Sequence, residues 1–150
     1  MPPLTFMKIS YEQQLNGQQK EAYNFQKVSA VLADFGFLTI PLSNDWNGAD
    51  FIAQMHDGIT FIKVQLKSRL TFDMKYRGKQ LHICFRDGIG DHSAWYMYDH
   101  DELLGQLIAE GQIENTKTWE LNKPYHFPVL SAHIKELLEP YRIPSIAGTA

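Results

Sequence analysis

The first regular hydrophobic pattern in the chain lies in residues 16–35 and has the spacing of a helix. Its apolar positions form one stripe: Phe25, Val28 and Leu32. Asn16 followed three residues later by Gln19 is typical of a capping box. Ser10 followed by Gln13 offers an earlier start, so the N-terminal boundary of this helix stays open. The pattern predicts a helix with one buried side.

The later apolar patterns predict strands and two more helices. Strands are expected at residues 37–42, 50–55, 59–67, 81–85 and 94–98, with a loop at 43–48. Asp99 and Glu102 have the spacing of a capping box for a second helix. Its inward residues are expected to be Leu103, Leu104, Leu107 and Ile108. A last helix is expected from about Ser131 to Pro140. This order predicts one α/β domain over residues 1–150, with a mixed central β-sheet flanked by α-helices.

An Asp-Gly pair at positions 57 and 58 lies between two of the predicted strands. This dipeptide favours a two-residue type I′ hairpin turn, which fixes the register so that the numbers of paired residues sum to 115. Phe51 then faces Val64, and one face of the hairpin is continuously apolar. The register predicts that this face packs on the core.

The opposite face of the hairpin carries a group of polar residues. Asp50 falls opposite Gln65, and Lys67 lies two residues further along, opposite Gly48, where we expect open space. A carboxylate and an amide oxygen suit Mg²⁺, which prefers oxygen ligands and keeps several waters. A lysine beside them suits phosphodiester hydrolysis, since it can stabilise charge on the phosphate. The helical stripe, extended back by one turn, reaches Glu21, which is expected to complete the shell.

These residues resemble the PD-(D/E)XK nuclease superfamily, which includes restriction endonucleases and Holliday-junction resolvases. The matching segments are KEAYNFQKVSAVLADFGF with Glu21, NGADFIA with Asp50, and VQLKS with Gln65 and Lys67. The resemblance covers residues 16–108 approximately and leaves the C-terminal extension, residues 112–150, unmatched. It implies a restriction-endonuclease-like fold and a metal-dependent endonuclease that hydrolyses DNA phosphodiester bonds.

The resemblance also implies a role for each site residue. Asp50 would bind the metal, helped by Gln65 and the backbone carbonyl of Leu66, and Lys67 would serve the nucleophile and the transition state. The expected ion is Mg²⁺, for which Mn²⁺ can substitute. Two positions depart from the family pattern. Gln65 replaces the usual acid, which makes this a QxK variant with weaker metal affinity, and Ala49 replaces the proline before Asp50.

Charge is distributed unevenly along the chain. Residues 63–79 contain six basic and one acidic residue, a net charge of +5, whereas the remainder has eight basic and sixteen acidic residues, or −8. A basic segment of this kind favours contact with nucleic-acid phosphates. The expected contacts are Lys63, Arg69, Lys75, Tyr76, Arg77 and Lys79, with Phe72 and Tyr76 placed for stacking. The alternative is an exposed strand edge protected by lysines.

Two other classes of function stay open. One is a non-catalytic nucleic-acid-binding module; the other is a protein-interaction module that uses C-terminal aromatic residues: Trp119, Tyr125, Phe127 and Tyr141. DNA is the expected partner, with RNA open, and a homodimer or higher homo-oligomer is consistent with cutting two strands. One cysteine and no long apolar run indicate a cytoplasmic protein without a membrane partner.

Overall fold

The computed structural model describes residues 1–46, 48–88, 93–113 and 124–146. Its helices are α1 (Tyr11–Gln14), α2 (Gly17–Ala33), α3 (His100–Ala109) and α5 (Ala132–Leu138), with short 3₁₀ helices η1 (Met74–Tyr76) and η3 (Glu139–Tyr141). Its strands are β1 (Phe37–Trp46), β2 (Ala49–Met55), β3 (Phe61–Lys67), β4 (Leu70–Phe72), β5 (Leu81–Asp87), β6 (Ala94–Asp99) and β7 (Tyr125–Phe127). None of the helices in these described ranges has the length and hydropathy to cross a membrane.

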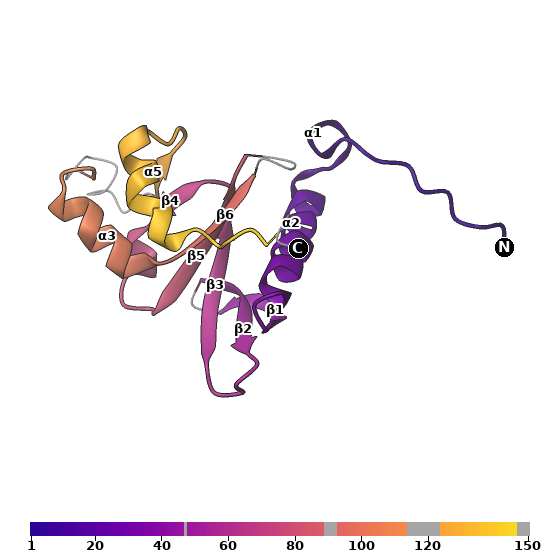
Figure 1. Ribbon diagram of the computed structural model, residues 1–150, viewed down its shortest axis with the longest axis horizontal. Helices are drawn as coiled ribbons and strands as arrows, with labels where there is room; N and C mark the ends of the chain where they lie inside the picture. Colours follow the sequence, from indigo (N-terminus) through magenta and orange to yellow (C-terminus); the bar gives the residue numbers. More distant parts are fainter. Residues whose placement is uncertain (47, 89–92, 114–123, 147–150) are drawn as a thin grey trace.

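Five strands form the central sheet, in the order β1-β2-β3-β5-β6. The β3–β5 pair is parallel and the other three pairs are antiparallel, so the sheet is mixed. Helix α2 lies on one side of this sheet, and α3 and α5 lie on the other side (Figure 1). The predicted fold class, a mixed central sheet flanked by helices, is confirmed.

Two hydrophobic clusters hold these layers together. The smaller one joins α2 to the sheet and contains Val28, Leu32, Phe51, Ala53, Val64, Cys84 and Trp95. The larger one lies under α3 and α5 and takes up Ile113, Ile134 and Leu138 from the C-terminal part of the chain. The segment that the family resemblance leaves unmatched therefore supplies part of the core.

Side-chain caps explain where the helices begin. Asn16 and Gln19 form the predicted capping box at the start of α2, with hydrogen bonds of 2.8 and 2.9 Å. Ser10 caps the separate short helix α1, accepting from the amide of Gln13 at 3.3 Å. Both candidate starts are therefore used, by two helices. Asp99 caps α3 as predicted, by accepting from the amide of Glu102 at 3.0 Å.

The β2–β3 hairpin has the predicted register, but its turn differs from the prediction. Phe51 pairs with Val64 and Ala53 pairs with Ile62. The amide of Gly58 donates to the carbonyl of Met55 at 3.0 Å, and Gly58 has φ +72°. Asp57 has no positive φ, so the expected type I′ turn is wrong. The Asp57 carboxylate instead accepts from the amides of residues 59 and 60, at 2.8 Å each, and the longer turn keeps the register.

Several element boundaries also differ from the sequence pattern. Strand β1 continues to Trp46 through an irregularity in its pairing with β2, where a loop over residues 43–48 was expected. Strands β4 and β7, which pair with each other, and helix η1 were not predicted. Ile108, expected to point inward from α3, is 43% exposed. These errors concern short elements and ends, where tertiary pairing outweighs local pattern.

Candidate active site

A cavity of about 600 Å³ lies where the C-terminal end of β3 meets the N-terminal half of α2. It is lined by all five residues predicted to form the catalytic and metal site: Glu21, Asp50, Gln65, Leu66 and Lys67. Because Val64 packs on the α2 side, strand alternation turns Gln65 and Lys67 of β3 toward the other face. Asp50 reaches the same end of β3 from β2, through a hydrogen bond to the amide of Leu66. Glu21 lines the same cavity from α2.

Asp50 is held by the backbone of the neighbouring strand. Its carboxylate oxygen Oδ2 accepts a hydrogen bond from the amide of Leu66 at 2.8 Å, while the residue as a whole is exposed. A carboxylate has about four acceptor positions, so this bond orients Asp50 and leaves further capacity for a ligand. The bond places the acid beside Gln65 and Leu66.

Gln65 has a buried oxygen that no group satisfies. Among the described residues, its Oε1 atom has no hydrogen-bond partner, and its Nε2 lies 3.5 Å from the carbonyl oxygen of Leu66, a long and weak contact. A buried acceptor without a partner costs folding free energy, so such groups are rare in folded proteins. An oxygen with an open lone pair beside a carboxylate fits a cation.

Lys67 rests on an aromatic ring. Its ammonium nitrogen lies 5.6 Å from the ring centroid of Tyr76, within the range of a cation–π contact. The open space expected at Gly48 is absent, because a Cβ atom there would lie 2.9 Å from both Tyr76 and Leu81. Gly48 is required for this close approach and for its φ of +88°. The prediction of open space is wrong, and Tyr76 supports the lysine instead.

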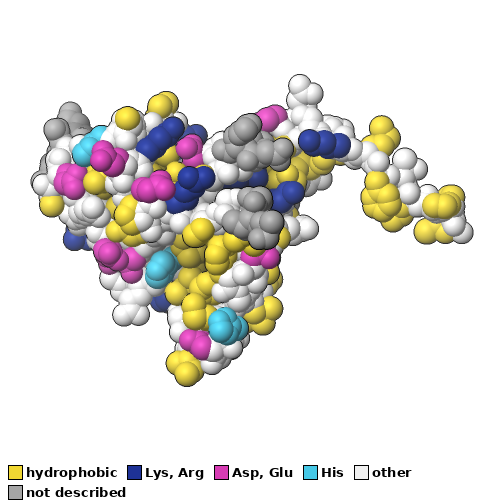
Figure 2. All heavy atoms as spheres, viewed as in Figure 1, with side chains coloured by type: hydrophobic (Ala, Val, Ile, Leu, Met, Phe, Trp, Pro, Cys, Tyr) yellow, Lys and Arg dark blue, Asp and Glu magenta, His cyan; other side chains and the backbone are white. Residues whose placement is uncertain are grey.

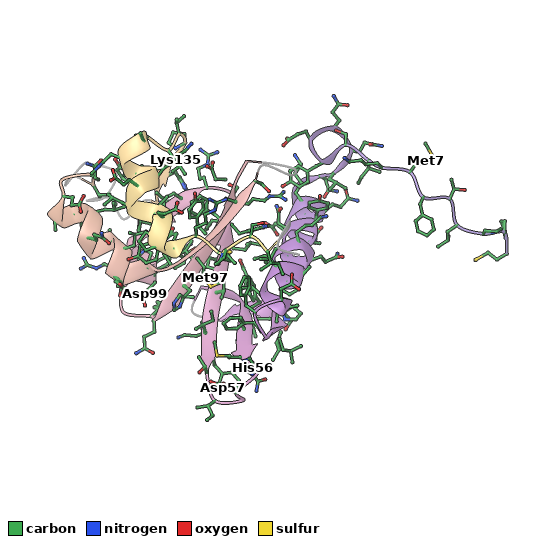
Figure 3. All side chains as sticks on the ribbon, viewed as in Figure 1. Met7, His56, Asp57, Met97, Asp99 and Lys135 are labelled. Carbon is green, nitrogen blue, oxygen red and sulfur yellow. The ribbon has the colours of Figure 1, made fainter. Side chains whose placement is uncertain are left out.

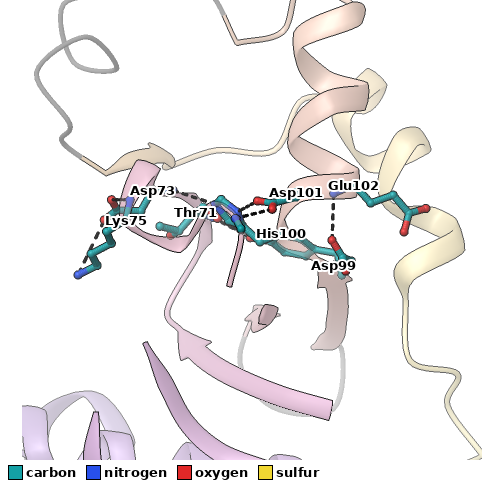
Figure 4. Close-up of polar contacts among 9 residues, drawn as sticks. Thr71, Asp73, Lys75, Asp99, His100, Asp101 and Glu102 are labelled. Atoms are coloured by element: carbon teal, nitrogen blue, oxygen red, sulfur yellow. Dashed lines mark hydrogen bonds and ion pairs between the residues drawn. The ribbon is translucent and has the colours of Figure 1, made fainter. Parts of the chain in front are cut away.

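A buried histidine holds the turn that carries Tyr76. The Nε2 atom of His100 accepts from the amide of Asp73 at 3.1 Å, so its proton lies on Nδ1, which is 2.8 Å from the Asp101 carboxylate (Figure 4). Asp101 also accepts from the amide of Gly78 at 2.8 Å. Both ends of η1 are thereby tied to the start of α3. Burial lowers the pKa of His100, against the opposing effect of Asp101, and favours the neutral ring.

The donor set suits a weakly bound hard cation. Among the described residues, no group of three or more histidine, cysteine, aspartate or glutamate side chains could hold a metal ion. The available ligands are the Asp50 carboxylate, Gln65 Oε1 and the Leu66 carbonyl, which are all oxygen atoms. Mg²⁺ binds through one or two carboxylates and retains waters, so this set fits Mg²⁺ better than zinc.

The basic segment, residues 63–79, is divided between surface and core. Arg69, Lys75 and Arg77 are exposed. The ammonium of Lys63 donates to the backbone carbonyl of Lys79 at 2.6 Å. Phe72 and Tyr76 are only 0% and 2% exposed, so the expected stacking of these two rings on nucleic acid is wrong. Their aromatic pattern reflects core packing.

Another cluster near the cavity had no local sequence signal. The guanidinium of Arg86 lies 5.8 Å from the ring centroids of both Tyr11 and Tyr23, and it donates to the side-chain oxygen of Asn24 at 3.1 Å. Asn24 in turn donates to the hydroxyl of Tyr11 at 2.8 Å. The partners lie up to 75 residues apart, since the cluster runs from position 11 to position 86. Only the folded sheet brings them together.

Comparison with known proteins finds a distant likeness of fold. No protein-family model and no curated protein matches the chain. Among solved structures, it is similar to Archaeoglobus fulgidus Hjc, a Holliday junction resolvase from an archaeal hyperthermophile. The match has a TM-score of 0.42 and 13% sequence identity, and covers 75% of this chain and 91% of that chain. Membership of the PD-(D/E)XK superfamily and the QxK variant stay predictions.

Proposed function

We propose that this protein is a metal-dependent endonuclease that hydrolyses DNA phosphodiester bonds. The observation that carries the proposal is the unsatisfied, buried Oε1 of Gln65, in the same cavity as Asp50 and Lys67. A buried acceptor of this kind is commonly satisfied by an ordered water or a bound ion, and the adjoining carboxylate of Asp50 favours a cation. Bound Mg²⁺, or Mn²⁺ in its place, would satisfy this oxygen.

Three oxygen ligands would hold the ion in this proposal. Asp50 contributes the charge, and Gln65 Oε1 and the Leu66 carbonyl contribute neutral oxygens. The bound ion would lower the pKa of a coordinated water and offset negative charge on the phosphate. Glu21, which lines the cavity from α2, would complete the outer shell by accepting hydrogen bonds from coordinated waters.

Lys67 would act on the attacking water and on the phosphate. The attacking water gives up a proton to bulk water as its oxygen forms a bond to phosphorus, and negative charge grows on the non-bridging oxygens. The bond to the leaving sugar oxygen breaks, and that oxygen takes up a proton from a solvent water. The ammonium of Lys67, supported by the Tyr76 ring, is a fixed positive charge that stabilises this charge. Tyr76 is a positioning residue, because it acts through Lys67.

The direct test compares the wild-type protein with Asp50→Asn and Lys67→Met on plasmid and branched DNA, with Mg²⁺ or Mn²⁺. Each substitution is expected to lower the cleavage rate at least about 100-fold, because Asp50→Asn removes the negative charge of the metal site and Lys67→Met removes a charge that stabilises the transition state. Lys27→Ala is the matched control, since this exposed lysine of α2 does not line the cavity. Equal rates in all four proteins would refute the proposal.

A second candidate is a DNA-binding module on the same fold without catalysis. Gln65 in place of an acid removes one negative charge from the site, which favours this alternative. Salt-dependent DNA binding without Mn²⁺ binding in calorimetry would identify it. The protein-interaction alternative would require that DNA affinity is absent even at low salt. Of its aromatic residues, Trp119 lies outside the described part of the chain.

A further inference from the structure

A second cavity, of about 290 Å³, lies beside the candidate active site. Ser68 lines both cavities, and its neighbours Lys67 and Arg69 line the first and the second cavity respectively. The walls of the second cavity come from the β3–β4 junction, the end of β5 and the C-terminal segment around α5. The two cavities are therefore adjacent along the chain and in space.

The charge of the second cavity is positive. Arg69, Arg86 and Lys135 line it, and Asp87 is the acidic residue among its lining side chains. Figure 3 shows Lys135 on α5, and Figure 2 shows Lys and Arg side chains on the surface between α5 and α2. Because the guanidinium of Arg86 contacts Asn24 of α2, the positive charge comes from Arg69 and Lys135. Two cations against one carboxylate favour an anionic ligand.

Two of these cations are available to a ligand. Arg69 and Lys135 are exposed, and no ion pair within the described ranges involves either side chain. The guanidinium of Arg86 is directed to the α2 side of the sheet, since it lies 5.2 Å from the Trp95 ring and donates to Asn24 at 3.1 Å. The second cavity thus has two exposed cations, Arg69 from the β3–β4 junction and Lys135 from α5. Two separate cations suit successive phosphates of one strand better than a single small anion.

We propose that the second cavity binds the backbone phosphates of the DNA strand next to the scissile phosphate. A strand whose scissile phosphate lies at Lys67 would pass Ser68 and meet Arg69 and then Lys135. This inference rests on the proposed nuclease function for the position of the scissile phosphate. The proposed DNA-contact surface lies away from η1, where the sequence alone placed the contacts Lys75 and Arg77. It includes Lys135 from the C-terminal part of the chain.

The test is DNA binding without metal, measured by fluorescence anisotropy of labelled duplex DNA in EDTA over a series of salt concentrations. Arg69→Glu and Lys135→Glu are each expected to weaken binding about tenfold. Each should also reduce the slope of log affinity against log salt by about 1, as expected for the loss of one phosphate contact. Both side chains are exposed, so the variants should fold, which circular dichroism checks.

Two matched charge reversals serve as controls. Lys27→Glu on α2, at an exposed position that lines neither cavity, is expected to leave the affinity within about twofold of wild type. Lys75→Glu tests the route over η1 and should have a smaller effect than Lys135→Glu. The proposal is overturned if Arg69→Glu and Lys135→Glu bind DNA as wild type does, if Lys75→Glu has the largest effect, or if the wild-type protein does not bind DNA.

The outcomes also separate this inference from the proposed function. If Arg69→Glu and Lys135→Glu lose affinity but the wild-type protein cleaves nothing with Mg²⁺ or Mn²⁺, the phosphate-binding cavity stands and the nuclease proposal fails. If the wild-type protein cleaves DNA and both variants cleave and bind normally, the nuclease proposal stands and the second cavity has no such role.

Discussion

Gln65 shows at the scale of one residue how stability and function can oppose each other. Its Oε1 atom is buried without a partner, and removing such an atom relieves the cost of its desolvation. We expect Gln65→Met to leave the free energy of unfolding unchanged or to raise it by about 1 kcal/mol, while metal binding weakens. Urea denaturation without metal and calorimetry with Mn²⁺ measure the two effects.

The matched control for this substitution is Gln54→Met. Gln54 is a half-buried glutamine of β2 that lines neither cavity, so its replacement should not alter Mn²⁺ binding. A loss of more than about 1 kcal/mol in Gln65→Met would show that its side chain has a structural partner, and would remove the main support for the metal site.

Replacing Gln65 by glutamate tests the family comparison more directly. Gln65→Glu restores the acid that the resemblance leads one to expect and adds one negative charge beside Asp50. We expect tighter Mn²⁺ binding in calorimetry, and faster cleavage if metal occupancy limits the wild-type rate. Weaker binding in Gln65→Glu than in wild type would contradict the proposed geometry, in which this side chain contacts the ion.

His100 makes stability depend on pH. Because burial lowers its pKa below the ordinary value of 6.5, the unfolded chain binds more protons than the folded chain at pH values just below 6.5. Stability should therefore be full above pH 6.5 and fall as the pH drops below it. His82 and His126, whose pKa values burial also lowers, contribute in the same direction.

His100→Gln isolates the contribution of His100. A glutamine can accept from the Asp73 amide but does not titrate, so its unfolding free energy should depend less steeply on pH below 6.5 than that of wild type. Urea denaturation at a series of pH values measures this difference. Parallel curves would mean that the folded protein does not keep His100 neutral.

At the scale of elements, local signals were sufficient for α2 and the β2–β3 hairpin and insufficient for the elements around them. The capping box at Asn16 and the apolar alternation of residues 50–67 are both local signals, because each depends on residues that are close together in the sequence. The sequence therefore predicted α2 and the register of the hairpin. The β4–β7 pair joins Thr71 to His126, 55 residues apart, and left no local pattern. Tyr76 was therefore mistaken for a ligand contact, because its partner His100 belongs to a distant helix.

The cap of α2 provides a prediction at this scale. Asn16→Ala removes the acceptor for the Gln19 amide and should lower the free energy of unfolding by about 1 kcal/mol. Because Gly17, Lys20 and Glu21 line the candidate active-site cavity, fraying of this helix end should also lower the proposed cleavage activity. Denaturant titration measures the first effect. Gln18→Ala is the control, at an exposed neighbouring position outside the capping box. It should change the free energy of unfolding by less than about 0.5 kcal/mol.

At the scale of the whole molecule, the C-terminal segment is the part of the chain that the family resemblance did not cover. Leu138 is fully buried in the larger hydrophobic cluster, together with Ile134, and Lys135 between them lines the second cavity. The packing of α5 thus fixes the position of a proposed phosphate contact. The sequence pattern predicted helix α5. Which face of the sheet α5 covers could not be predicted, because that depends on the assembled sheet.

Leu138→Ala tests whether this segment is part of the folding unit. The substitution leaves a cavity in the core and should lower the free energy of unfolding by about 2–5 kcal/mol. Val129→Ala, at a position 79% exposed in the same segment, should change it by less than about 0.5 kcal/mol. If both variants unfold at the wild-type denaturant concentration, α5 is not packed on the sheet. Lys135 would then not be fixed beside the site, because only that packing places it there.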